Sequence, residues 1–125
     1  MRGTVVARTA IALAIAVSGC AHTVTPQELA DATTRAVYDG DYARTADRFD
    51  DALKTQVTRS SVGQLSDRMH ALGAYRGLKP AGTDASRNRY DFEAAFDKGT
   101  MLVQIRLDPD GKLAAYRVAP QGAST

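Results

Sequence analysis

The apolar residues of this chain change their spacing once, near Gly73. Before that point they recur every three or four residues, which is the period of an α-helix that buries one face. After it they recur at every second residue, which is the period of a β-strand with one buried face. Helices followed by strands in one short chain indicate an α+β fold, with N-terminal helices packed on one face of an antiparallel sheet.

Three helices are expected before Gly73. The first is expected at 26–38, because Thr25 and Glu28 have the spacing of a capping box and proline occupies the first helical position. A second helix is expected at 41–53, where apolar residues recur at helical intervals. A third is expected at 61–72, opened by a second capping box between Ser61 and Gln64 and closed by Gly73.

Four strands are expected in the second half. They are predicted at 74–79, 89–97, 101–107 and 113–119 from the alternation of apolar and polar residues. Residues 80–84 contain proline and glycine and are expected to form a loop. The Asp-Pro-Asp-Gly sequence that follows the third strand predicts a tight hairpin turn.

Three short sequence motifs, found in this order of expected helices and strands, resemble those of a known domain family. They are YDGDY at 38–42, LGAYR at 72–76 and YDFEAAF at 90–96. Over Glu28 to Pro120 the pattern resembles an uncharacterised bacterial domain of unknown function in the nuclear-transport-factor-2-like (cystatin-like) superfamily. The resemblance implies a curved sheet of about four strands wrapped around a long helix, with a conical cavity. It implies no reaction, because related folds serve as enzymes, dimerisation modules and binding modules.

The cavity implied by this resemblance has two interpretations. Five aromatic residues on or beside the expected inner face of the sheet are candidates to line a pocket for an apolar or amphipathic ligand: Tyr75, Tyr90, Phe92, Phe96 and Tyr116. The other interpretation is that these side chains form the core beneath the helices.

Three functions are compatible with such a domain. A non-catalytic binding or accessory domain is favoured, because alternation turns Asp91, Glu93 and Asp97 away from the inner face. The first alternative is a small enzyme of isomerase or dehydratase type that uses a tyrosine and a carboxylate in the cone, since the resemblance implies acid–base residues at that place in the isomerases of the superfamily. The second is an accessory partner of an envelope hydrolase, since relatives of this domain often precede an α/β-hydrolase domain.

The N-terminal segment has the form of an export signal. Two arginines precede the uncharged apolar run 9–17, which has the length of a signal-peptide core, roughly 7–15 residues, and is too short to span a bilayer. The sequence Val17-Ser18-Gly19-Cys20 resembles the lipobox of bacterial lipoproteins. In that class the cysteine thiol receives a diacylglycerol and the signal is cleaved just before it. The resemblance implies that Cys20 carries acyl chains such as palmitate and attaches the protein to a membrane.

Cleavage before Cys20 divides the chain into four expected parts. They are a signal peptide at 1–19, a lipidated tether at 20–25, a domain at 26–120 and a flexible tail at 121–125. Alanine rather than aspartate follows the cysteine, which in a Gram-negative organism favours the periplasmic face of the outer membrane. In an organism with one membrane the expected location is the outer face of the cell membrane.

Charge and residue types bear on the partners. The chain has sixteen Lys and Arg and fourteen Asp and Glu, and the signal peptide removes two arginines and no acid, so the mature side chains are neutral. The remaining basic residues are scattered in the sequence, and no nucleic acid is expected as a partner. The only histidines are His22 and His70, and no metal, cofactor or catalytic residue is expected. The membrane is the expected partner, while a homodimer, an envelope protein and an apolar ligand remain open.

Overall fold

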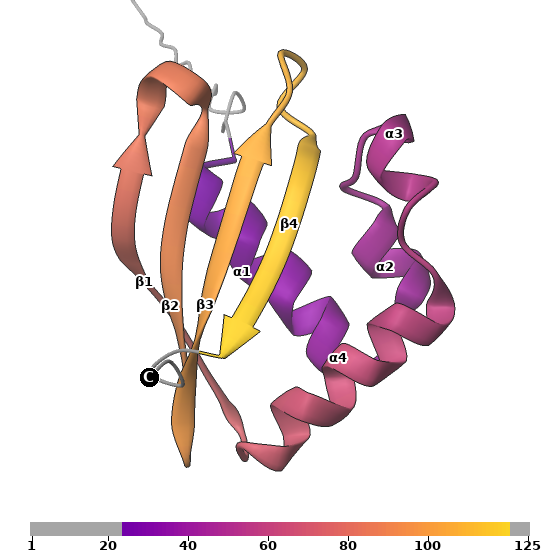
Figure 1. Cartoon of the computed structure of the whole chain (residues 1–125), viewed down its shortest axis with the longest axis vertical. Helices are drawn as coiled ribbons and strands as arrows, with labels where there is room; N and C mark the ends of the chain where they lie inside the picture. The colour runs from indigo at the N-terminus through magenta and orange to yellow at the C-terminus, as the bar shows by residue number, and fades with distance from the viewer. Residues whose placement is uncertain (1–23, 121–125) are drawn as a thin grey trace, which may run out of the picture.

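The computed structural model describes residues 24–120, which fold as helices followed by a sheet (Figure 1). The helices are α1 (Pro26–Tyr38), α2 (Tyr42–Ala46), α3 (Asp51–Lys54) and α4 (Arg59–Ala71). The strands are β1 (Tyr75–Asp84), β2 (Arg89–Phe96), β3 (Gly99–Leu107) and β4 (Leu113–Pro120), with the 3₁₀ turn η2 (Ala85–Arg87) between β1 and β2. The predicted α+β class, with helices packed on a curved antiparallel sheet of four strands, is confirmed.

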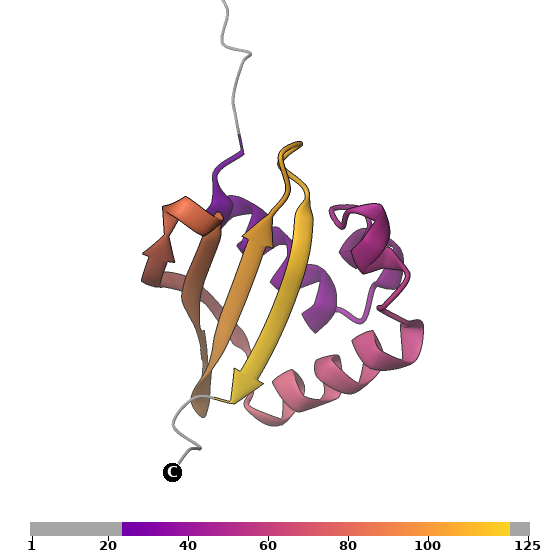
Figure 2. The same cartoon turned by 45° about the horizontal axis from the view of Figure 1, so that its top comes forward.

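The sheet is an open meander in which each strand pairs with the next one in sequence. Helix α1 crosses one face of it, and the opposite face carries no helix (Figures 1 and 2). Side chains from both layers fill the space between the helices and the sheet, and the largest apolar ones that are completely buried are Val37, Phe49, Met69, Val103, Ile105 and Leu113. Burial of this apolar surface, worth about 25 cal/mol per Å², holds the two layers together.

Helix α1 begins as the sequence predicts. The backbone N–H of Glu28 donates to Oγ1 of Thr25 at 3.1 Å, and the N–H of Thr25 donates to Oε1 of Glu28 at 2.9 Å. The two residues thus satisfy each other's free backbone donors, and Pro26 starts the helix with its φ already fixed. The face turned to the sheet buries Leu29 and Val37.

The single helix expected at 41–53 is wrong, because the chain forms two short helices there. Asp50 caps α3 by accepting the N–H of Leu53 at 2.8 Å, which starts a new helix instead of continuing α2. The backbone between the helices pairs with β4. The N–H of Asp50 donates to the carbonyl oxygen of Leu113 at 2.8 Å, and the N–H of Leu113 donates to the carbonyl oxygen of Arg48 at 2.8 Å. A distant strand therefore satisfies the groups that a continuous helix would have satisfied itself.

The start of the third helix also differs from the prediction. Thr58, in extended conformation, caps α4 and forms a reciprocal capping box with Ser61, so the helix begins at Arg59 rather than at Ser61. The expected box between Ser61 and Gln64 is therefore wrong. A serine at the third helical position can play the part that Glu or Gln usually plays.

Strand β1 is longer than predicted. It continues through 80–84, where a loop was expected, with Pro80 opposite Phe92 and Gly82 opposite Asp91. The register shifts twice along this pairing, between Tyr75 and Gly77 and between Pro80 and Gly82. A proline is tolerated because β1 lies at the edge of the sheet, where an N–H pointing to solvent is not needed.

The rest of the meander follows the predicted alternation. In β2, Phe92, Ala94 and Phe96 are buried, while Asp91 and Glu93 lie on the outer face. The predicted turn between β3 and β4 is present, and the carboxylate of Asp108 accepts two backbone N–H groups there. In β4, Tyr116 and Val118 share the inner face with β3 as expected. Leu113 rather than Ala114 is the buried residue at the start of β4, because the register shifts there.

Several predicted features lie outside the described residues. They are the signal peptide at 1–19, the lipidated Cys20 with residues 21–23 of its tether, and the tail at 121–125. Within 24–120, no helix combines the length and the apolar character that crossing a bilayer requires.

Candidate functional site

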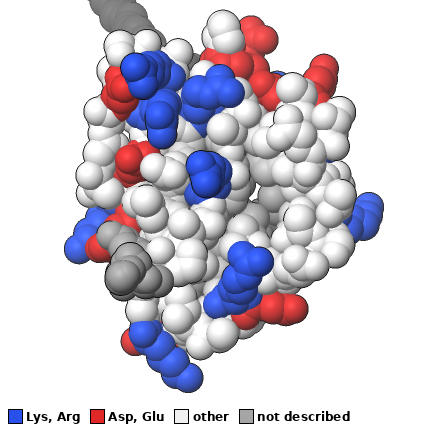
Figure 3. Space-filling model, in the orientation of Figure 1, with Lys and Arg blue, Asp and Glu red and all other residues white. Residues whose placement is uncertain are grey.

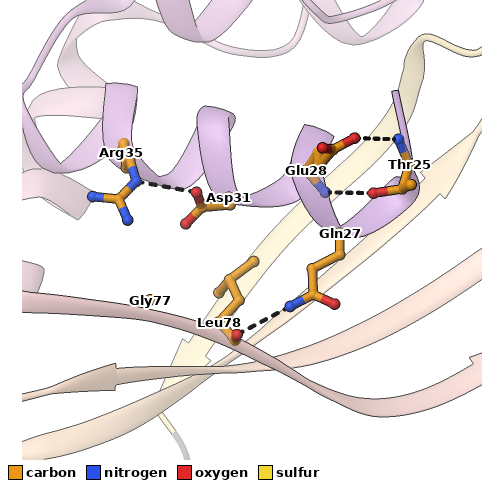
Figure 4. A pocket seen from close by; sticks show the side chains of 7 residues that line it. All are labelled: Thr25, Gln27, Glu28, Asp31, Arg35, Gly77 and Leu78. Atoms are coloured by element: carbon orange, nitrogen blue, oxygen red, sulfur yellow. Dashed lines mark hydrogen bonds and ion pairs between the residues drawn. The ribbon is translucent and has the colours of Figure 1, made fainter. Parts of the chain in front are cut away.

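A groove of about 410 Å³ lies between the first half of α1 and strand β1 (Figure 4). We call it the α1–β1 groove, and its lining residues are Thr25, Gln27, Glu28, Asp31, Arg35, Gly77 and Leu78. Gln27 reaches across it and donates from Nε2 to the carbonyl oxygen of Leu78 at 3.1 Å. One wall therefore consists of polar helix side chains and the other of strand backbone, which suits a polar ligand better than an apolar one.

Three side chains beside this groove contact one another. The hydroxyl of Tyr75 donates to Oδ1 of Asp31 at 2.6 Å, and Nε of Arg35 donates to Oδ2 of the same carboxylate at 3.0 Å. The guanidinium of Arg35 also lies over the Tyr75 ring, 5.0 Å from its centroid. Both oxygens of Asp31 thus have a donor, and its charge has a counterion on the next helical turn.

These contacts determine the protonation of the site. Burial raises the pKa of Tyr75 above its ordinary value of 10.0, and the hydrogen bond to Asp31 raises it further. The same carboxylate raises the pKa of Arg35. Tyr75 therefore stays a protonated donor at neutral pH, and an efficient general base needs a pKa near the working pH. The arrangement is suited to holding a ligand by hydrogen bonds rather than to moving protons.

The aromatic residues that the sequence singled out lie in or beside the core. Phe92 and Phe96 are buried under the helices, and Tyr75, Tyr90 and Tyr116 are partly buried against them. The Tyr116 hydroxyl lies 2.8 Å from Oγ1 of the buried Thr34 on α1. Tyr75 also lines a second hollow of about 290 Å³ next to the α1–β1 groove. Of the five, Tyr75 is thus the one that connects the core with the candidate site.

His70 has a structural contact in this fold. Its ring stacks on Tyr38 at a centroid distance of 4.0 Å, and its Nε2 lies 2.7 Å from the Tyr38 carbonyl oxygen. The hydroxyl of Ser66 donates to the same oxygen at 2.8 Å, so α4 is tied to the end of α1 by both residues. In the described part of the chain, no three His, Cys, Asp or Glu side chains are grouped to hold a metal ion.

Sequence reasoning did not identify Asp31 and Arg35 as site residues. Their spacing of four positions on one helix is the signal that predicts an ion pair, and the structure shows this pair at 3.0 Å. The third member, Tyr75, follows 44 positions after Asp31, and only the packing of β1 on α1 brings it to the carboxylate. Comparison of the chain with family models, with curated proteins and with solved structures finds no match.

Proposed function

We propose that this chain is a lipoprotein of the bacterial cell envelope, held at a membrane by a lipid on Cys20, and that 26–120 is a non-catalytic binding or accessory domain. The observation that carries the proposal is how soon the folded domain follows the lipobox. Thr25 already caps α1, so only 21–24 lie between it and Cys20. Five residue steps span at most about 18 Å, which is the tether expected for a domain carried close to a lipid surface.

The contacts around Asp31 support a binding role for the domain. The carboxylate is paired with Arg35 and bonded to Tyr75, and its side chain is 33% exposed, so it is reachable from the α1–β1 groove. A ligand with both hydrogen-bond donors and acceptors can address Asp31 and Arg35 together.

An enzyme is the second candidate, and one contact favours it. The bond from Tyr75 to Asp31 is the only tyrosine–carboxylate hydrogen bond within 24–120. An isomerase or dehydratase of the type considered above needs such a pair. Incubation of the purified protein with a bacterial metabolite extract, followed by mass spectrometry and chromatography, tests this candidate. A conversion seen with wild type and absent with Asp31→Asn establishes the enzyme, whereas we expect the same composition with both proteins.

The lipid on Cys20 is tested directly by substitution. Wild type and Cys20→Ser are expressed in a bacterium fed with a labelled fatty acid, and the cells are separated into membrane and soluble fractions. We expect label and membrane association for the wild type and loss of both for Cys20→Ser. A matched control, Ala21→Ser, changes the neighbouring residue and should keep the label. An exported wild type that is soluble and unlabelled contradicts the proposal.

A further inference from the structure

Four arginines gather on the sheet face that the helices leave open. We call Arg87, Arg89, Arg106 and Arg117 the arginine cluster; they come from η2, β2, β3 and β4, and all four are exposed. Together with Gln104, Ile105 and Ala115 they line a hollow of about 410 Å³. Figure 3 shows basic side chains collected over the upper ends of β2 and β3 on this face.

The charges of this cluster are not balanced inside the domain. Arg89 and Arg106 are register partners on neighbouring strands, and like charges directly opposite each other destabilise a sheet. Within 24–120, the guanidinium groups of Arg89, Arg106 and Arg117 have no hydrogen bond or ion pair. The remaining member, Arg87, has Asp84 at 3.7 Å.

Two acids lie close to the cluster, since Asp84 on β1 is the register partner of Arg89 and Asp91 follows Arg89 on the same face of β2, but neither forms an ion pair with Arg89, Arg106 or Arg117. Glu93 on the outer face is paired with Lys79 at 3.2 Å. The carboxylate of Asp91 is turned toward the backbone of Gly82 on β1. In the β3–β4 turn, Asp108 accepts two backbone N–H groups. The cluster has four guanidinium groups beside the two carboxylates of Asp84 and Asp91, so it keeps a net positive charge that a negative group from outside would neutralise.

The position of the cluster identifies the source of that negative charge. The start of α1, the turn η2 and the ends of β2 and β3 that carry Arg89 and Arg106 lie at the same end of the molecule (Figures 1 and 2). The chain from Thr25 back to Cys20 is at most about 18 Å long. A lipid on Cys20 therefore keeps this end close to the headgroups, at a distance that an arginine side chain and a Debye length of about 8 Å can bridge.

We propose that the arginine cluster binds the phosphate groups of anionic phospholipids in the membrane that carries the lipid anchor. The inference rests on the proposed lipidation of Cys20. Guanidinium groups form bidentate hydrogen bonds with phosphate, and Ala115, opposite Arg106, leaves the space that a headgroup needs. The anchor supplies attachment, and the arginines set the orientation, with the outer face of the sheet lying toward the bilayer.

The orientation of the sheet relative to the bilayer can be measured with the lipidated mature chain, which begins at Cys20, inserted into vesicles. One set consists of phosphatidylcholine, and the other of equal parts of phosphatidylcholine and phosphatidylglycerol. Flotation separates vesicle-bound protein, which is then treated with an arginine-modifying dicarbonyl reagent and analysed by peptide mass spectrometry. We expect modification of the arginine cluster to slow severalfold on the anionic vesicles, and high salt to remove the difference.

Variants separate this contact from a general effect of the vesicles. Arg89→Gln/Arg106→Gln should float as well as the wild type but lose the protection of Arg117, because each basic residue near an anionic surface contributes about fivefold to its binding. Arg68 on α4, at the other end of the molecule, is the internal control, and its modification rate and the behaviour of Arg68→Gln should not depend on the lipid.

The remaining outcomes distinguish the two proposals. Protein that floats while the cluster reacts equally on both vesicles overturns the headgroup contact and leaves the anchor in place. Protein that floats with neither vesicle overturns the anchor and this inference with it. Protection that appears on neutral vesicles only after envelope proteins are added overturns the lipid contact in favour of an acidic protein.

Discussion

The hydrogen bond between Thr34 and Tyr116 joins the helical layer to the last strand. Its two oxygens are 2.8 Å apart, and Thr34 has no exposed surface. We expect Tyr116→Phe to lower the free energy of unfolding by about 1–3 kcal/mol, because it leaves the Thr34 hydroxyl buried without this partner. Thr34→Val should have a comparable effect, because the Tyr116 hydroxyl, whose pKa is raised by burial, is then left buried without this partner.

The double variant Thr34→Val/Tyr116→Phe tests this reasoning, because it removes both polar groups and nearly keeps their shapes. The double variant should lose less unfolding free energy than the two single variants lose together, by about 1 kcal/mol or more. The chain has no tryptophan, so urea unfolding of the leader-free protein is followed by far-ultraviolet circular dichroism. Losses that add within about 0.3–0.5 kcal/mol would falsify the coupling and would show that Thr34 finds another acceptor.

Further predictions use the same unfolding measurement. Gly73→Ala should cost more than about 1 kcal/mol, because Gly73 has φ +96° and an added Cβ would lie 2.7 Å from Cβ of Asp97. Gly63→Ala, inside α4 with no atom within 4 Å of the new Cβ, should instead stabilise by about 0.5–1 kcal/mol. Arg106→Gln should raise stability by up to about 0.5 kcal/mol, because the register partners of Arg106 are Arg89 and Ala115 and neither is acidic; the gain should vanish at high salt, and a loss contradicts the proposed repulsion. The Arg76 guanidinium and the Ala74 N–H lower the pKa of Asp97 below 3.8. The ionised Asp97 therefore stabilises the fold above pH 3.8, and this stabilisation is lost as the pH falls below that value. Asp97→Asn should not show this loss. Burial raises the pKa of Tyr116 above 10.0, so this tyrosine ionises at a lower pH in the unfolded chain and stability falls above pH 10. Tyr116→Phe should flatten that decline, and an unchanged slope contradicts the assignment of the decline to Tyr116.

The sequence predicts an element well where its signals are local. Helix α1 has its cap, its proline and its apolar face within a single stretch, and the structure reproduces all three. The helix expected at 41–53 was wrong because the apolar residues keep helical spacing across a break, with Ala46 before it, Phe49 within it and Leu53 after it. That break is stabilised by Leu113, which lies 64 positions after Phe49, and no local pattern reports such a contact.

The same distinction applies to the sites. The ion pair of Asp31 and Arg35 is readable from a spacing of four on a helix, but its contact with Tyr75 depends on how β1 packs. The arginine cluster looks in the sequence like scattered surface charge. Strand register alone places Arg89 opposite Arg106, and a shift by one residue would turn one of them to the other face.

The irregular pairing of β1 has a consequence for crowding. A regular edge strand offers a row of unpaired backbone groups to a neighbouring molecule, and proteins held at high density on a surface meet such neighbours constantly. Here two register shifts interrupt that row, Pro80 removes one donor from it, and Lys79 adds charge beside it. At the opposite edge, the segment 48–50 already occupies the first position of β4. The sheet is thereby protected against growing into a neighbouring copy through β1, a protection that would matter for copies crowded on one surface by the proposed anchor.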